Sequence, residues 1–562
     1  MTKSRSVFSR ELAARAVDRS GREWLYIPYD QLSDAIGRLA RSNASELGIV
    51  LIEAPAKAAR RPYHRQKLAL VLANQRHFAL EQAERGIAVH YVVAERGYAE
   101  ALAALPREFG PLHVMEAAER ELRVELQPLV ASGALLVERH EGWLTTRADF
   151  EQSAGKHAPW RMDAFYRHVR QRTGLLMDGS RPIGGKYSFD AENRKPWRGQ
   201  PPAPEPPCFE PDAITREVMG LIAAHFTHHP GVLDATALPA TAADAEALWR
   251  WARAACLPHF GPFEDALSTR SSGLFHSRVS ALLNLHRLLP ARLVNEAAAD
   301  ETLPLACREG FVRQILGWRE FVRHVHRHTD GFRQLPDGAP QSATRPGDGG
   351  FAGWSGKAWP GAPSSPGDGG ACPSALDAHE PLPAVYWGEP SGLRCLDHVV
   401  AGVWREGWSH HISRLMVLSN LATLLGFEPR ELTDWFWVAY ADAFDWVVEP
   451  NVLAMGSYAV ADLMTTKPYV SGAAYINKMS DFCGGCAFDP AENCPITRLY
   501  WAFLGRHEQR LARNPRFFGP VASLRKRASH EREEDARIFA SVRAQLASRT
   551  LLSPASLVRR AV

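Results

Sequence analysis

Gly48-Ile-Val-Leu-Ile52, a helical pattern over 62–85, and Ile87-Ala-Val-His-Tyr-Val-Val93 follow one another in the first third of the chain. The two apolar runs have the length and the branched residues of buried β-strands. One side of the helical pattern carries Leu68, Leu72, Gln75, Phe78 and Gln82, and Pro62 suits the first turn of a helix. A strand, a helix and a second strand in this order predict a parallel sheet covered by helices.

Three further apolar runs extend this pattern. Trp24-Leu-Tyr-Ile27 precedes it, and Leu112-His-Val-Met115 and Ala134-Leu-Leu-Val137 follow it. Together they predict an α/β domain over 23–150, with a parallel sheet and flanking helices, after an N-terminal tail at 1–22. No Gly-x-Gly-x-x-Gly motif follows the first strand, which excludes the dinucleotide-binding fingerprint.

The organisation changes after residue 150. Residues 151–211 have no regular pattern and end in Gln200-Pro-Pro-Ala-Pro-Glu-Pro-Pro207, which is typical of an extended interdomain connector. Helical patterns then dominate 212–550, and 551–562 is a C-terminal tail. Within the helical part, about 333–380 is rich in Gly, Pro, Ser and Asp, which predicts a flexible insertion. The clearest helical patterns cover 309–328, 396–425 and 431–448.

The composition is that of an ordinary globular protein. The 562 residues are 46% hydrophobic and 23% charged. The formal net charge of +4 is too small to indicate a nucleic-acid partner by itself. No run of eighteen apolar residues is present, and the polar, Arg-rich start does not resemble a secretory signal. We therefore expect a cytoplasmic protein without membrane association, with a monomer as the default.

Three of the eight cysteines are close together near the C-terminal end. Cys483-Gly-Gly-Cys486 is followed seven residues later by Cys494 and then Pro495. This spacing predicts a structural zinc or an iron–sulfur cluster that takes a fourth ligand from elsewhere, against a redox dithiol or a coincidence. The other cysteines are Cys208, Cys256, Cys307, Cys372 and Cys395. The spacing favours Cys395 only modestly, because Cys395 opens the helical pattern that carries His410 and His411.

The adjacent pair His410 and His411 is the second candidate for chemistry. Adjacent residues on a helix point about 100° apart, so at most one of the two faces the core. A solvent-facing or capping pair is the ordinary alternative to a catalytic one. The tryptophans of the same half, among them Trp387, Trp404 and Trp435, are explained equally well by core filling.

Longer stretches resemble the iron–sulfur bacterial cryptochromes and photolyases, whose best-understood members are (6-4) photolyases. The similarity extends over about 47–511 and is weakest in the insertion. The matching stretches are Met162-Asp-Ala-Phe-Tyr166, Thr173-Gly-Leu-Leu-Met177, Phe189-Asp-Ala-Glu-Asn-Arg194, Glu309-Gly-Phe-Val-Arg-Gln-Ile-Leu-Gly-Trp-Arg-Glu320, His410-His-Ile-Ser-Arg-Leu-Met416, Tyr440-Ala-Asp-Ala443, Thr466-Lys-Pro-Tyr469 and Tyr475-Ile-Asn-Lys-Met-Ser-Asp-Phe-Cys483. This resemblance implies the photolyase/cryptochrome architecture, in which an α/β antenna domain is joined to an all-α FAD-binding domain.

The resemblance also implies the cofactors and their ligands. FAD would lie folded in a U within the helical domain, and a [4Fe–4S] cluster would be bound by Cys395, Cys483, Cys486 and Cys494. The residues implied for FAD are Ser272, Gly273, Leu274, His276, Ser277 and Ser280 at the diphosphate, Gln314, Trp318 and Arg319 on a helix against the flavin, and Asp442 and Asn451 at the ring. Glu53 corresponds to a residue that contacts a ribityl-lumazine antenna.

The catalytic residues implied are His411, with His410 behind it, and Tyr469 near the lesion. Trp435, Phe436 and Trp387 occupy electron-relay positions, although Phe436 replaces a more easily oxidised tyrosine. The expected activity is light-driven repair of (6-4) photoproducts in UV-damaged DNA by electron transfer from reduced FAD and histidine-assisted proton transfer. The alternatives are a cryptochrome-like photoreceptor with little repair and a non-photochemical DNA-binding protein with a structural metal. A lumazine, a folate or no antenna are all compatible with the sequence.

Overall fold

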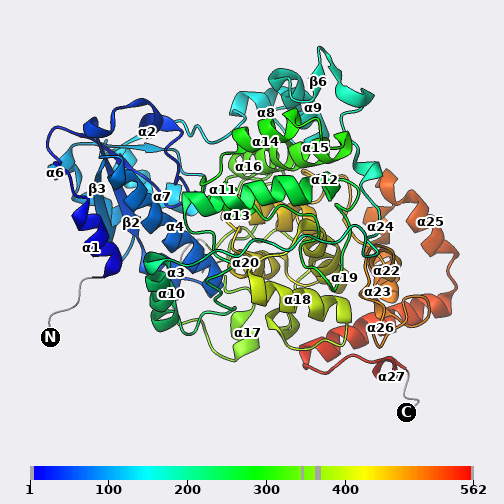
Figure 1. Cartoon of the computed structure of the whole chain (residues 1–562). Coiled ribbons are helices and arrows are strands. Elements are labelled where there is room, and N and C mark those ends of the chain that lie inside the picture. Colours follow the sequence, from blue (N-terminus) through cyan, green and yellow to red (C-terminus); the bar gives the residue numbers. More distant parts are fainter. Residues whose placement is uncertain (1–5, 344–346, 361–368, 559–562) are drawn as a thin grey trace.

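The computed structural model describes residues 6–343, 347–360 and 369–558, which form an α/β domain and a larger helical domain (Figure 1). The strands of the α/β domain are β1 (Glu23–Tyr26), β2 (Leu47–Glu53), β3 (Ala88–Val93), β4 (Leu112–Met115) and β5 (Leu135–Glu138). They pair in parallel in the order β3-β2-β1-β4-β5. All five predicted strands and the parallel sheet are confirmed. The strands β2 and β3 are added on one side of β1, and β4 and β5 on the other, so the strand order reverses between β1 and β4.

The predicted crossover helix is α4 (Arg65–Glu84). It begins after Pro62 rather than with it, because His64 caps the helix by accepting a hydrogen bond from the backbone N–H of Gln66. The helix α4 is buried on more than one face, because it packs against β2, β3 and also α10 (Ala213–His225). A helix from beyond the predicted connector therefore contributes to the packing around the sheet.

Both segments predicted as tails contain packed helices. Near the N-terminus, α1 (Val7–Ala14) buries Phe8, whose ring meets that of Tyr91 edge-on at 4.6 Å. Near the C-terminus, α27 (Pro554–Leu557) buries Leu557. Phe8 is the buried residue of α1, and Leu552 and Leu557 are buried in the C-terminal segment; so few apolar residues are too weak a pattern to recognise in a sequence.

The connector is also more regular than predicted. It contains α9 (Met162–Thr173), and α8 (Arg147–Ala154) crosses its predicted start. The apolar residues Phe165, Tyr166 and Val169 of α9 are buried, which gives this helix a core-facing side. The prediction of an irregular segment over all of 151–211 is therefore wrong.

One long helix of the helical domain agrees with the prediction over 309–328. It consists of α15 (Leu305–Val312), a π-helical segment η5 (Arg313–Arg319) and α16 (Glu320–His328). The wider π turn places Gln314, Trp318 and Arg319 along one cavity. Short π segments within α-helices are frequently found at functional sites.

The other two predicted helices are interrupted. The pattern over 396–425 divides at Gly407, which ends α18 (Arg394–Glu406) in a left-handed conformation with φ 61°. Helical backbone resumes at His411 and leads through η7 (Ser413–Ser419) into α19 (Asn420–Leu425). His410 and His411 therefore lie at the start of a helix, not within one. This is a correction of the predicted single helix.

The pattern over 431–448 divides in the same manner. The helix α20 (Pro429–Ala439) ends before a short non-helical stretch, and α21 (Asp445–Val448) follows. Tyr440 and Asp442 lie in this stretch, so the interruption brings Asp442 to the cavity that the neighbouring helices line.

The described part of the predicted flexible insertion is packed against the helical domain. It contains α17 (Phe351–Ser355), whose Phe351 is buried, and Trp359 is buried as well. The Trp387 side chain donates a hydrogen bond to the carbonyl of Gly349 at 3.0 Å. The prediction is therefore wrong for these residues, whereas 344–346 and 361–368 lie outside the described residues.

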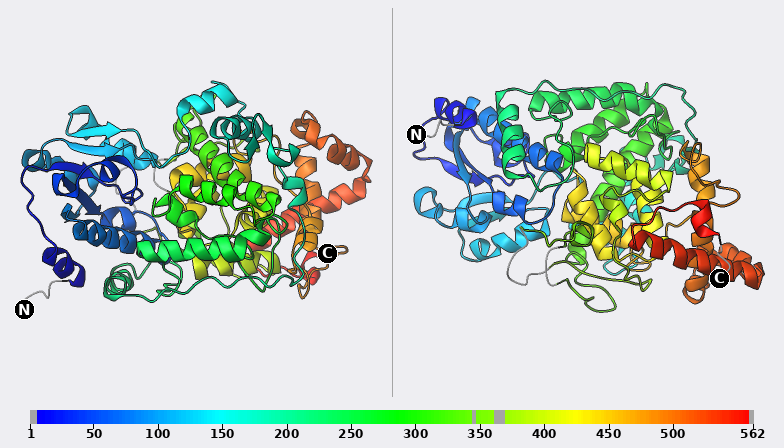
Figure 2. Two further views of the ribbon diagram at one scale, coloured as in Figure 1. Left: turned by 45° about the horizontal axis from the view of Figure 1, so that its top comes forward. Right: turned by 90° about the horizontal axis from the view of Figure 1, so that it is seen from below.

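The C-terminal helices lie at the end of the helical domain that faces away from the sheet (Figure 2). The long helix α26 (Ser529–Ala547) packs against α23 (Pro495–Arg506), which begins directly after Cys494. Among the described helices, none combines the length and the apolar character that a membrane crossing requires.

Candidate functional site

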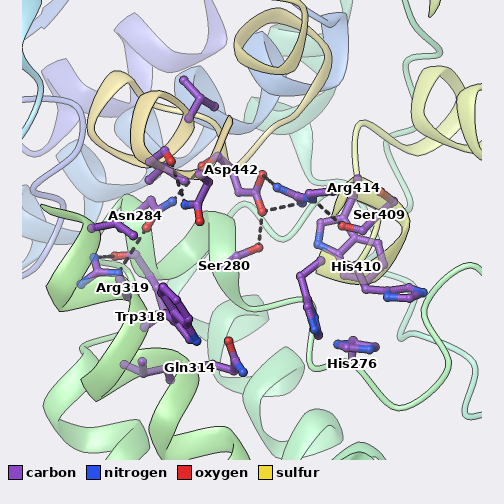
Figure 3. A pocket seen from close by; sticks show the side chains of 18 of the residues that line it. His276, Ser280, Asn284, Gln314, Trp318, Arg319, Ser409, His410, Arg414 and Asp442 are labelled. Atoms are coloured by element: carbon purple, nitrogen blue, oxygen red, sulfur yellow. Dashed lines mark hydrogen bonds and ion pairs between the residues drawn. The ribbon is translucent and has the colours of Figure 1, made fainter. Parts of the chain in front are cut away.

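A cavity of about 330 Å³ lies within the helical domain (Figure 3). Its lining comes from α13 (Ser280–Asn284), from the π turn of the long helix, from the start of η7 and from residues 442–455. Among the residues implied by the family resemblance, those that line the cavity are His276, Ser277, Ser280, Gln314, Trp318, Arg319, His410, His411, Phe436, Asp442 and Asn451. Residues as far apart in the sequence as Phe260 and Met455 therefore converge on one site.

Asp442 is the charged centre of one wall of the cavity. Both of its carboxylate oxygens accept hydrogen bonds from Arg414, at 3.0 and 2.9 Å, and one also accepts a bond from the Ser280 hydroxyl at 2.7 Å. Asn284 donates to the Asp442 carbonyl at 2.8 Å. This bidentate pair neutralises the carboxylate and fixes the non-helical stretch between α20 and α21. Arg414 and Asn284 were not among the predicted site residues.

Arg319 supplies a cation that the protein only partly satisfies. It donates to the carbonyl of Leu283 at 3.1 Å, and its guanidinium lies 4.1 Å from the centre of the Trp143 ring. Its Nη1 atom is buried without a hydrogen-bond partner. Burial lowers the pKa of Arg319 to about 10. Oε1 of the buried Glu320 lies 3.6 Å from this atom, an ion pair without a hydrogen bond, so Nη1 can still donate to an oxygen acceptor of a ligand in the cavity.

His276, His410 and His411 form a compact group at another part of the lining. Their ligating nitrogen atoms lie within 4.8 Å of one another, and the rings of His276 and His410 stack at 4.4 Å with an interplanar angle of 11°. Two rings stacked face to face do not aim their nitrogens at a common point, so the arrangement does not suit coordination of a single metal ion. Burial lowers the pKa of all three, most strongly for His276 and His410, which favours neutral imidazoles.

Asp265 is the acidic neighbour of this histidine group. Its Oδ1 lies 3.9 Å from Nε2 of His411, and its Oδ2 accepts a hydrogen bond from the Tyr475 hydroxyl at 3.2 Å. Burial keeps the pKa of His411 below its ordinary value, and the Asp265 carboxylate offsets part of this lowering. Tyr469 is half-buried and lies outside the cavity lining; burial and the charge of Asp190 raise its pKa.

The segment Ser272-Gly273-Leu274 also lies outside the lining. The Ser272 hydroxyl donates to Glu406 at 2.9 Å and accepts from Arg278 at 2.8 Å. Arg278 does line the cavity, where its guanidinium covers the Trp408 ring at 4.3 Å. Ser272 therefore orients Arg278, and Leu274 is a buried core residue.

Five aromatic rings form a continuous path from the cavity through the core. Phe436, which lines the cavity, lies 5.2 Å from Trp435, and Trp435 lies 6.0 Å from Trp404. Trp404 stacks on Trp387 at 5.0 Å, and Trp387 stacks on the half-buried Trp354 at 5.5 Å. The three predicted relay residues thus belong to one path, but Trp404 and Trp354 are needed to connect and extend it. Trp354 lies in the predicted insertion, where no signal in the sequence pointed to a role.

The four predicted cluster ligands Cys395, Cys483, Cys486 and Cys494 line one small cavity together with apolar side chains such as Phe482. Four thiols around one cavity are a donor set that suits an iron–sulfur cluster or a zinc ion.

Glu53, at the end of β2, is already fully engaged by protein groups. Its carboxylate accepts hydrogen bonds from Nε of Arg76 at 2.6 Å and from the Tyr91 hydroxyl at 2.6 Å. The side chain is only 7% exposed, and Phe8 of α1 packs over the Arg76 guanidinium. In this arrangement Glu53 offers no open carboxylate for an antenna chromophore.

Comparison with known proteins places these features in a family. Residues 25–238 match the family described as deoxyribodipyrimidine photo-lyase-related protein. The (6-4) photolyase of Agrobacterium fabrum is 31% identical over 516 residues, which cover 88% of this chain and 94% of that protein. The crystal structure of a bacterial class III photolyase from Agrobacterium tumefaciens has the same fold, with a TM-score of 0.53 and 14% identity over 94% of this chain and 99% of that one. The chain therefore belongs to the bacterial (6-4) photolyase and cryptochrome family, as its sequence predicts.

Proposed function

We propose that this protein is a DNA photolyase that uses light to repair (6-4) photoproducts, with FAD in the cavity of the helical domain. The observation that carries the proposal is the convergence of a partly unsatisfied Arg319, the Arg414–Asp442 pair and the histidine group on one cavity. The family membership and the named activity of the Agrobacterium fabrum relative support it. FAD, when bound and reduced, supplies the photoexcited electron donor.

The residues around the cavity divide into binding and proton-transfer roles. Arg319 Nη1, Gln314 and Asn451 would bind and orient the cofactor, and Arg278, which is ion-paired with Glu406 at 3.0 Å, would contact a phosphate group. A cavity of about 330 Å³ is in the range of small-molecule sites. The proposed binding of FAD therefore rests on the polar side chains that line this cavity.

His411 is the proposed proton donor to the lesion. Its side chain is 41% exposed, the most open of the three histidines, and it lies beside Asp265. The carboxylate stabilises the protonated imidazole, while buried His410 and His276 supply neutral rings behind it. Proton transfer to a cross-linked base needs a group of near-neutral pKa, which histidine provides. Tyr469 remains a candidate for contact with the DNA.

The aromatic path and the cysteines have separate proposed roles. The path from Trp354 to Phe436 would carry an electron toward the cavity when the cofactor has to be reduced. A [4Fe–4S] cluster on the four cysteines would tie the C-terminal segment to α18, whose first residues include Cys395. A lumazine antenna at Glu53 is not part of the proposal, because the carboxylate is paired with Arg76.

A defined oligonucleotide with one (6-4) photoproduct tests the proposal. The reduced protein is illuminated with it, and restored bases are quantified by chromatography, with a dark sample as control. We expect repair by the wild type and loss of repair in His411→Ala with flavin content unchanged. Flavin binding without repair would identify a photoreceptor instead, and a protein without flavin or iron would indicate the non-photochemical alternative.

A further inference from the structure

One short segment of the helical domain, residues 264–269, contacts the first cavity, that of about 330 Å³, at one of its ends. The buried Glu264 carboxylate accepts a hydrogen bond from the Gln314 amide at 2.6 Å, and the Glu264 carbonyl lies 3.1 Å from Nε2 of His276. Both of these partners line the cavity (Figure 3). The next residue, Asp265, is the acidic neighbour of the histidine group. The segment therefore holds two carboxylates against the wall of the cavity.

The other end of the segment is bound by Asp481, which lies two residues before Cys483. Its Oδ2 accepts hydrogen bonds from the hydroxyls of Ser268 at 2.8 Å and Thr269 at 3.2 Å. Its Oδ1 accepts a bond from the backbone N–H of Thr269 at 2.7 Å. We refer to these three bonds as the Asp481 contact. Hydrogen bonds to an ionised carboxylate are stronger than those between neutral groups, so this contact fixes the segment firmly.

The helix before this contact, α22 (Ala473–Met479), supports the same segment at two further points. The carbonyl of Met479 accepts a hydrogen bond from the backbone N–H of Leu267 at 2.9 Å, and the Tyr475 hydroxyl donates to Asp265 at 3.2 Å. Only two buried residues separate Asp265 from the residues that Asp481 binds. A displacement at the Asp481 contact therefore has a short, packed path to Asp265.

We propose that Asp481 is a positioning residue, whose hydrogen bonds hold residues 264–269 so that the Asp265 carboxylate stays beside Nε2 of His411. Its consequence for repair rests on the proposed function, in which His411 is the proton donor. The other charged or titratable groups that face His411 are Asp190, His276, Arg313, His410 and Arg414. Among all of these groups, only Asp265 belongs to the segment that Asp481 holds.

The pKa of His411, measured by NMR titration of the cofactor-loaded protein, tests this proposal without measuring repair. Asp481→Asn keeps the size of the side chain but offers one acceptor oxygen instead of two. With solvent-like screening, a move of the Asp265 carboxylate from 3.9 Å to about 6 Å weakens its attraction for protonated His411 by about a third and lowers the pKa by about 0.3. Ser268→Ala/Thr269→Val removes the two hydroxyl donors, keeps the charge of Asp481 and should lower the pKa in the same direction.

A double-mutant cycle separates positioning from a direct effect of the lost charge. In Asp265→Asn there is no carboxylate to position, so the addition of Asp481→Asn should produce no further shift in the pKa of His411. Glu492→Gln removes an exposed negative charge from the same cysteine-bearing segment and should leave that pKa unchanged. Thermal unfolding checks that each variant is folded, and the Ser268→Ala/Thr269→Val variant carries the test if Asp481→Asn does not fold.

A lowered pKa that is lost in the Asp265→Asn background supports the proposal. The proposal is overturned if the folded variants of the Asp481 contact leave the pKa of His411 where Glu492→Gln leaves it. It is also overturned if Asp481→Asn lowers the pKa equally with and without the Asp265 carboxylate, because the shift would then not pass through Asp265. Neither result depends on repair, so failure here leaves the proposed photolyase activity to its own test.

Discussion

Replacing Asp265 by asparagine tests the proposed proton donor. The carboxylate lies 3.9 Å from Nε2 of His411, a side chain that is 41% exposed. With solvent-like screening at this distance, the interaction of two unit charges is about 1 kcal/mol, which corresponds to about 0.8 pKa unit. Because Asp265 raises the pKa of His411, Asp265→Asn should lower that pKa by this amount.

NMR titration of the imidazole carbon resonances measures this shift, with the His411 signal assigned by its loss in His411→Gln. The protonated fraction of a histidine falls as the pH rises through its pKa. If protonated His411 is the donor, the falling limb of the repair–pH profile should move to lower pH by the same amount in Asp265→Asn. Asp163→Asn, at an exposed position on α9, is the control. An unchanged His411 pKa in Asp265→Asn would refute the electrostatic reasoning.

Three other substitutions test separate parts of the account. Cys395→Ser should reduce bound iron to near zero and lower the melting temperature, whereas Cys208→Ser, at an exposed position, should do neither; retained iron would contradict the ligand assignment. Trp404→Phe should slow light-driven flavin reduction by a thiol severalfold relative to Trp251→Phe, and equal rates would exclude the path through Trp404. Arg414→Met leaves Asp442 without its ion-pair partner and should lower the free energy of unfolding by about 3 kcal/mol in urea titrations; a loss below about 1 kcal/mol would mean that solvent already screens the pair.

The sheet was predictable because its signal is local. Each strand is a short run of apolar, mostly branched residues, and the strand–helix–strand order implies parallel pairing. The register and the order β3-β2-β1-β4-β5 depend on contacts between distant segments, which no single stretch specifies. Segments held by one buried side chain, such as α1 with Phe8, left no pattern to detect.

The helical domain was harder to predict at the places that matter for function. The helical spacing of apolar residues continues across Gly407, yet the helix ends there, because the glycine adopts a left-handed conformation. The π turn over 313–319 has no distinct sequence signature either. Both features redirect side chains into the first cavity, so the positions of His411 and Arg319 follow from these irregular turns.

The candidate site was predicted through its motifs rather than through its electrostatics. The resemblance pointed to Asp442 and Arg319, but the partners Arg414 and Asn284 emerge only when the segments are brought together. The same holds for Trp354, which extends the aromatic path from within a Gly-rich segment. Partners of this kind are set by tertiary packing and cannot be read from residue spacing.

The most direct test of the central claim is light-dependent repair with two lesions in competition. The reduced wild-type protein is illuminated with equal amounts of two oligonucleotides, one with a (6-4) photoproduct and one with a cyclobutane dimer, and restored bases are measured by mass spectrometry. The proposed activity predicts restoration of the (6-4) oligonucleotide in the light and none in the dark. An unrepaired (6-4) oligonucleotide in a sample whose flavin is bound and reduced would contradict it.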